Sequence, residues 1–169
     1  MDKLKPSLGF TLIEILVVLL IVSLLALIIA ALVFRNILGR GGDAARKAEI
    51  VQIGRILTFG CYLPEAGGGE YDIIPLLNEI FTKKPQFRTY IQRIPKDPRV
   101  GTEGRSGYIY TVSVDGKNCA LYANLESNSE QITLPNLTNP TPGGGSGVLK
   151  GTAIGVNGTN IYFQVSSSR

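Results

Sequence analysis

A single acidic residue, Glu14, lies inside a long run of apolar residues and is the strongest chemical signal in the sequence. A carboxylate in a bilayer costs about 2.5 kcal/mol or more near the centre unless a partner offsets its charge. Cleavage between Gly9 and Phe10 would create such a partner, because the new α-amino group of Phe10 is positively charged near neutral pH. We therefore expect Glu14 to pair with the amine of a neighbouring chain. The alternative is that its carboxylate reaches the membrane interface.

Little else in the sequence is suited to catalysis or metal binding. It contains no His, the commonest general base and metal ligand, and its two Cys residues do not suffice for a zinc site. No nucleophile–base pair is recognisable, and the glycines at 143–145 lack the Lys-Ser/Thr ending of a phosphate-binding loop. The net charge of +4 comes from scattered basic residues, which favours a solvated surface. We expect no enzyme, no cofactor and no metal.

Residues 10–38, which must position Glu14, predict a membrane-spanning helix. From Ile15 to Phe34 the chain carries no charge, and about 20 residues at about 1.5 Å each span a hydrocarbon core of about 30 Å. A secretory signal has a shorter apolar core, of about 7–15 residues, that ends in its cleavage site. Here the break at Gly9–Phe10 precedes the apolar run, so the run would be retained. Basic residues flank the run on both sides, so the charge rule leaves its orientation open.

The start of the chain resembles the class III signal of type IV prepilins and type II secretion pseudopilins. The resemblance lies in Lys5-Pro6-Ser7-Leu8-Gly9, then Phe10-Thr11-Leu12-Ile13-Glu14, then the apolar run. It implies a leader of residues 1–9, cleavage between Gly9 and Phe10 by a prepilin peptidase, N-methylation of Phe10, and a role for Glu14 in assembly. It also implies a helical homopolymer, an inner-membrane platform protein and a cytoplasmic assembly ATPase. The precursor would be a single-pass protein of the inner (cytoplasmic) membrane, and the product an extracellular filament.

One departure from that family concerns the helix after the span. Many relatives have a helix-breaking proline in the second half of the apolar segment, whereas this chain has Ala31 near that place and no proline from Phe10 to Leu63. Three glycines follow the span instead, at positions 39, 41 and 42. Glycine costs about 1 kcal/mol in a helix interior relative to alanine. We expect these glycines to interrupt the helix, and any local melting on assembly to occur there.

Residues 39–63 predict the second half of the long helix. Ile50, Ile53 and Leu57 recur at helical spacing and form one apolar face, and Pro64 is expected to end the helix. The family resemblance implies that this half packs on a sheet. The predicted fold is therefore α+β and type IV pilin-like: a long N-terminal helix, transmembrane in its first half, on a small antiparallel β-sheet.

Residues 64–169 predict a small globular α/β head. We expect a loop over 65–71, a short helix over 72–83, and an extended stretch at Arg93–Pro98. Alternating residues over 108–114 and the stretch 119–125 predict a hairpin around Asp115-Gly116. Residues 133–150 predict a long surface loop, and 152–156 with 159–165 a second hairpin around Asn157-Gly158. Four strands result.

The two cysteines, Cys61 and Cys119, lie near the expected helix end and on an expected strand that packs against it. Outside the cytoplasm a disulfide between them would persist. The alternative is two buried thiols.

Several roles remain open within the family. The leading hypothesis is a pilus subunit, and the first alternative is a secretion pseudopilin. Major pseudopilins typically carry an acidic calcium-binding loop late in the head, whereas this chain has Glu126-Ser127-Asn128-Ser129-Glu130 and then no clustered acids. This departure favours a pilin without a metal. A further alternative is a minor pilin that binds DNA or surfaces, and its candidate residues are Arg88, Tyr90, Arg93 and Lys96, for which a plain solvated surface is the simpler interpretation.

Overall fold

The computed structural model describes residues 11–58 and 60–168, with the backbone alone for residues 31–40. The chain divides into two compact units, residues 1–38 and residues 39–169. The first helix, α1, spans Leu12–Leu57. Its portion from residue 39 onward belongs to the second unit, which we call the head.

Helix α1 corrects two expectations. It includes Gly39, Gly41 and Gly42, so these glycines do not interrupt it in the single chain. About 1 kcal/mol per glycine is too little to break a helix with long flanking segments on both sides. The helix also ends at Leu57 rather than near Leu63. Cys61 adopts a positive φ of 44°, in the left-handed region, which a right-handed helix cannot accommodate.

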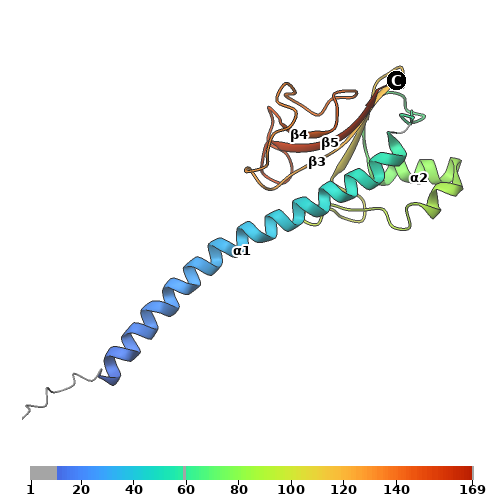
Figure 1. Cartoon of the computed structure of the whole chain (residues 1–169). Coiled ribbons are helices and arrows are strands. Elements are labelled where there is room, and N and C mark those ends of the chain that lie inside the picture. Colours follow the sequence, from blue (N-terminus) through green and yellow to red (C-terminus); the bar gives the residue numbers. More distant parts are fainter. Residues whose placement is uncertain (1–10, 59, 169) are drawn as a thin grey trace, which may run out of the picture. The chain divides into compact units, whose positions relative to one another are not determined.

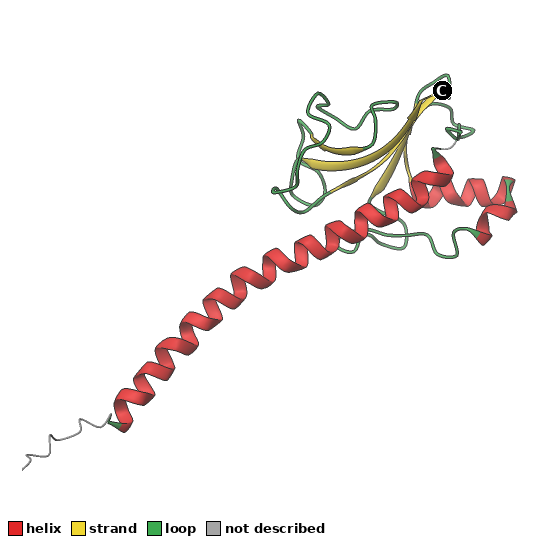
Figure 2. Ribbon diagram, in the orientation of Figure 1, coloured by secondary structure: helices red, strands yellow, loops and turns green. Residues whose placement is uncertain are grey.

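The head contains one five-stranded antiparallel sheet. Its strands are β1 (Gly69–Asp72), β2 (Tyr108–Val112), β3 (Asn118–Asn124), β4 (Gly147–Lys150) and β5 (Ile161–Ser168), in the spatial order β1-β2-β3-β5-β4. Helix α2 (Ile73–Lys83) and a 3-10 turn, η1 (Pro85–Thr89), lie between β1 and β2 in the sequence. Figures 1 and 2 show the sheet with the last turns of α1 and with α2 on the same side of it. The predicted α+β class is confirmed.

The core fills the space between this part of α1, α2 and one face of the sheet. Ile50, Ile53 and Leu57 are at most 1% exposed and share a cluster with Tyr108 and Tyr110. The two tyrosines alternate along β2 with Ile109 and Thr111, which lie on the other face of the sheet, and Tyr110 lies opposite Leu121 of β3. Gly54 lets the helix approach the sheet, because a Cβ at this position would lie 3.0 Å from the Val165 side chain.

Two elements of the sheet differ from the prediction. Residues 69–71 were expected in a loop and Asp72 in the following helix, but together they form β1, which pairs with β2. The expected strand at 152–156 is wrong: the partner of β5 is Gly147–Lys150, from the segment predicted as a loop, and residues 151–160 connect them. The hairpin around Asp115-Gly116 is confirmed, with Gly116 at a φ of 68° in the turn. Helix α2 is confirmed as well, and Asp72 caps it by accepting from the backbone amide of Ile74 at 2.9 Å.

A fully buried arginine connects α1 to the loops of the head. The Arg46 guanidinium donates twice to the Asp97 carboxylate, at 2.7 and 2.9 Å, and once to Asp43 at 2.9 Å. It also donates to Glu126 at 2.5 Å. Asp43 in turn accepts from the backbone amides of Glu126 and Ser127. These bonds fasten α1 to the segments around residues 97 and 126.

The same contacts stabilise the charged forms of the central pair. Burial alone would lower the pKa of Arg46, but the hydrogen bonds to Asp97 and Glu126 outweigh burial and raise it. Burial would raise the pKa of Asp97, but Arg46, Asn157 and two backbone amides outweigh burial and hold it below its ordinary value. Arg46 and Asp97 therefore remain charged inside the head.

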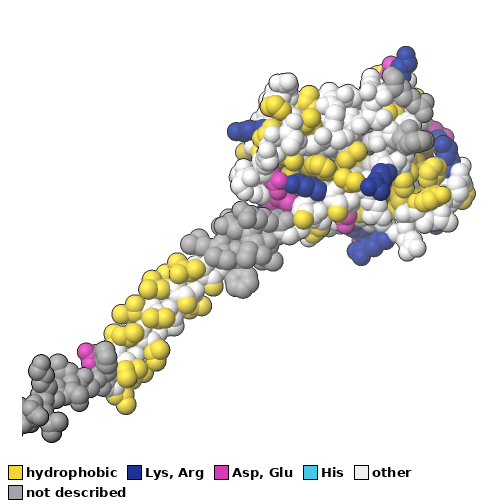
Figure 3. Space-filling model, viewed as in Figure 1, with side chains coloured by type: hydrophobic (Ala, Val, Ile, Leu, Met, Phe, Trp, Pro, Cys, Tyr) yellow, Lys and Arg dark blue, Asp and Glu magenta, His cyan; other side chains and the backbone are white. Residues whose placement is uncertain are grey.

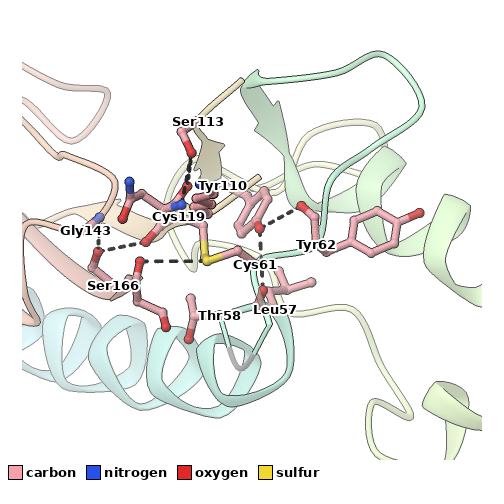
Figure 4. The surroundings of a disulfide bond; sticks show 12 residues. Leu57, Thr58, Cys61, Tyr62, Tyr110, Ser113, Cys119, Gly143 and Ser166 are labelled. Carbon is pink, nitrogen blue, oxygen red and sulfur yellow. Dashed lines mark hydrogen bonds between the residues drawn. A yellow bond between two sulfur atoms is a disulfide. The ribbon is translucent and has the colours of Figure 1, made fainter. Parts of the chain in front are cut away.

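A disulfide ties the end of α1 to the middle of the sheet. Cys61 and Cys119 are joined with their Cα atoms 5.4 Å apart, and both side chains are buried. Beside the bond, the Tyr110 hydroxyl donates to the carbonyl of Tyr62 at 2.8 Å (Figure 4). The loop after the helix is thus fixed to β3 by the disulfide and to β2 by this hydrogen bond.

We predict that Arg46→Met lowers the free energy of unfolding of the head by about 3–5 kcal/mol, because it leaves two buried carboxylates without their counter-ion. Arg55→Met is the matched control, since Arg55 is exposed on the same helix, and it should change the stability by about 0.5 kcal/mol or less. Urea unfolding of the detergent-solubilised chain can be followed by tyrosine fluorescence, because all 7 tyrosines lie in the head and there is no tryptophan. Equal stability of the two variants would contradict the role of Arg46.

We predict that the double variant Cys61→Ala, Cys119→Ala is less stable than the native chain by up to about 4 kcal/mol, since the bond closes a sequence separation of 58 residues. The native chain should lose a similar amount when a reductant is added, and the double variant should not respond. Two titratable thiols in the unfolded, unreduced exported protein would contradict the bridge.

Candidate functional site

The start of α1 is built as a capping box around Glu14. The Glu14 carboxylate accepts from the backbone amide and from the hydroxyl of Thr11, each at 3.1 Å, and the amide of Glu14 donates to the Thr11 hydroxyl at 3.3 Å. Thr11 precedes the first helical residue, so its side chain and that of Glu14 satisfy each other's backbone groups reciprocally. An acidic group at this end also interacts favourably with the helix dipole.

This cap adds a role for Thr11 that the sequence analysis did not include. The signal was present, since Thr11-Leu12-Ile13-Glu14 has the spacing of a Ser/Thr-x-x-Glu capping box before an apolar run. Both described bonds to the Glu14 side chain end on the same oxygen, Oε2. The expected cleavage site and methylated residue, Gly9 and Phe10, lie outside the described residues, and so does the leader.

The apolar segment around and after Glu14 has no buried residue from Leu12 to Ala30. Leu12–Ala30 is a run of 19 residues with a mean hydropathy of 3.3, long and apolar enough to cross a membrane. Its large side chains are 51–77% exposed, on every side of the helix. Figure 3 shows this apolar surface in yellow. A surface of this kind needs lipid or another apolar surface around it, because exposing this much apolar surface to water is unfavourable.

The two acidic residues of the stretch 126–130, where pseudopilins carry a calcium-binding loop, are paired with cations of the same chain. Glu126 accepts from Arg46, and Glu130 forms an ion pair with Lys47 of α1. Within residues 11–58 and 60–168, no group of three or more His, Cys, Asp or Glu side chains is arranged to hold a metal ion. The two acids of this stretch therefore fasten a loop to α1.

The four residues considered for nucleic-acid or surface binding do not all meet in one place. Tyr90, Arg93 and Lys96 line one groove beside α1, with a volume of about 510 Å³. The Arg88 guanidinium instead lies over the Phe81 ring, 5.4 Å from its centroid. The structure thus brings together three of the four.

Comparison with known proteins identifies the N-terminal segment. Residues 4–30 match the family model described as the prokaryotic N-terminal methylation motif. This match includes Gly9, Phe10 and Glu14, and the whole of the exposed apolar segment Leu12–Ala30. No curated protein and no solved structure matched the chain. The chain carries the class III signal peptide of type IV pilins and pseudopilins, on an α+β architecture that matches the type IV pilin-like fold.

Proposed function

We propose that this chain is a structural pilin that polymerises into an extracellular type IV pilus-like filament after leader cleavage and N-methylation. The observation that carries the proposal is the methylation motif of residues 4–30 running directly into the exposed apolar helix. The motif supports processing by a prepilin peptidase, and the helix supports a membrane-anchored precursor. The inner-membrane platform protein and the assembly ATPase are part of the proposal.

Polymerisation in this scheme exchanges lipid for protein around Leu12–Ala30. Lipid tails are as apolar as leucine side chains, so close packing between helices, rather than release of water, must favour the filament. The uniform exposure of this segment supports the exchange, since every side of the helix is free to contact a neighbouring copy. No catalytic group is needed for such a step.

Glu14 would select the register of each incoming subunit. The mature Phe10 amine carries a positive charge, and burying it in an apolar core is tolerable only if it is paired. The Glu14 carboxylate of an adjacent copy can supply that pair, because the cap occupies one of its oxygens and an ionised carboxylate accepts several bonds. A shift in register would leave both charges unpaired.

A secretion pseudopilin is the alternative within the same scheme, because its subunits share the signal peptide and helix. The ion pairs of Glu126 and Glu130 with α1 favour the pilin, since they engage the acids that a calcium-binding loop would need. The two roles differ in where the processed chain accumulates.

We predict that protein sheared from the cell surface starts at N-methylated Phe10, as measured by intact mass and N-terminal peptide sequencing. Abundant processed chain in that fraction supports a major pilus subunit. Processed chain confined to membranes would favour the pseudopilin or a minor subunit. A chain that keeps residues 1–9 after co-expression with an active cognate peptidase would contradict the proposal.

We predict that Glu14→Gln is processed and accumulates in the membrane but lowers filament yield at least about tenfold, because an unpaired buried amine costs about 3–5 kcal/mol. Glutamine can take the place of glutamate in the capping box, so this variant removes the negative charge and keeps the cap. Thr11→Val is the complementary control: it removes the capping hydroxyl, keeps the carboxylate, and should assemble nearly normally. Normal filament yield from Glu14→Gln would rule out the charge pair.

A further inference from the structure

The connection between β4 and β5 contains the only Asn-Gly pair of the sequence, Asn157-Gly158 (Figure 1). A glycine after an asparagine favours deamidation, because it has no Cβ to hinder the approach of its amide nitrogen to the asparagine side chain. In this reaction the glycine nitrogen attacks the side-chain carbon Cγ. The bond from Cγ to Nδ2 breaks, and ammonia leaves with the proton of the glycine amide.

Water completes the reaction by opening the cyclic imide that results. If water breaks the bond between Cγ and the glycine nitrogen, the product is aspartate in a normal backbone. If it breaks the backbone C–N bond instead, the product is isoaspartate, whose backbone runs through Cγ and is longer by a carbon atom. Either product carries a new carboxylate in place of the amide.

The fold requires both residues of this pair. The Asn157 side-chain nitrogen donates to the Asp97 carboxylate and to the backbone carbonyl of Asn124, each at 2.8 Å. An ionised carboxylate at this position could donate neither bond. Gly158 has a φ of 86°, in the left-handed region that glycine adopts without a steric cost. The structure therefore maintains a chemically labile pair at this position.

In the folded head the reaction is blocked at both reacting groups. Asn157 is only 3% exposed, and its side chain is held by the two bonds to Asp97 and Asn124. The backbone amide of Gly158 donates to the carbonyl of Gly155 at 3.0 Å, so the proton that must leave during the attack is engaged. The attack thus requires that both sets of bonds break at the same time.

The connection of residues 151–160 can open while the sheet remains intact, because it belongs to no strand. Its buried attachments are made by side chains: Asn157 donates to Asp97, and the Thr159 hydroxyl donates to the carbonyl of Leu125 at 2.5 Å. Segments with few attachments open at a lower free-energy cost than core strands do. Asp97 is itself held by Arg46, so loss of that cation should favour opening.

Deamidation would prevent the connection from closing again in its original form. The new carboxylate would face the Asp97 carboxylate at the place where the amide now donates to it. Two like charges in a buried site oppose each other, and a buried charge without a partner is costly. The longer backbone of isoaspartate would in addition displace Gly158.

We propose that Asn157 is a deamidation site controlled by opening of residues 151–160, so that a head that opens acquires a permanent covalent mark. The folded head protects the site, and the opened head exposes it to water. This modification goes beyond filament formation and does not depend on it.

The first test compares the full-length protein in neutral detergent, folded and unfolded in guanidinium chloride with reductant. Trypsin releases residues 151–169 as one peptide, and its fragment masses locate the conversion of Asn157. Unfolding should raise the rate at Asn157 at least about 100-fold, because only open molecules react. Asn128, which is exposed and precedes a serine, is the internal control and should change little. Equal rates at Asn157 in the folded and unfolded protein would overturn the proposal.

The second test opens the connection without denaturant. Arg46→Met should raise the rate at Asn157 at least about tenfold, because it releases Asp97 and increases the open population. Arg55→Met, at an exposed position of the same helix, should leave the rate unchanged. The same rate at Asn157 in both variants would contradict control by opening.

The third test asks whether the mark prevents closure. Asn157→Asp, which reproduces one product, should lower the urea midpoint of the head by at least about 1 M. Asn136→Asp makes the same chemical change at an exposed position and should leave the midpoint near that of the native chain. Equal midpoints in the two variants would show that the modified connection closes normally and would overturn the permanent mark. None of these outcomes bears on the filament, which is measured by processing and filament yield.

Discussion

The buried guanidinium of Arg46 determines how the loops of the head are held to the part of α1 that belongs to it. Four segments meet at this cation or at its partner carboxylate: α1 itself and the loops around residues 97, 126 and 157. Arginine suits this position because its planar group offers five donors in a fixed geometry, where lysine would offer a single ammonium. Apolar packing alone is not directional, so these bonds specify which loop lies against which turn of the helix.

Helix α1 satisfies opposite demands along its length. Within the head, its buried apolar residues occupy one face, and Ile50 and Ile53 have no exposed surface. In the segment Leu12–Ala30, apolar residues occupy all faces and none is buried. The first part is complete within one chain, whereas the second needs surroundings that a single chain does not provide. Folding of the head and the proposed association of the filament thus depend on different residues of one helix.

The sequence predicted features that depend on local pattern and missed those that depend on distant neighbours. The alternation along 108–112 identified β2, and the motif at residues 5–14 identified the processing signal. Strand β4 was missed because Gly147–Lys150 is short and lies between turn residues. Only its pairing with β5, a separate segment of the chain, makes it a strand. The Asn157-Gly158 pair predicted a tight turn between two strands. These residues lie instead in the connection formed by residues 151–160, where the Asn157 side chain donates a hydrogen bond to Asp97. Burial of Arg46 could not be predicted, since arginine on a helix is ordinarily exposed and its partners Asp97 and Glu126 lie 51 and 80 residues away.

In the proposed filament, where each subunit would be anchored by its helix, the disulfide has a mechanical consequence. A pull on α1 reaches Cys61 and passes through a covalent bond into β3, the middle strand of the sheet. Helix α2, η1 and the strands β1 and β2 lie on the bypassed stretch and carry none of the load. Without the bond, that stretch of 58 residues could unfold under tension and lengthen to about 200 Å of extended chain. With it, the head transmits force as a short, nearly inextensible link.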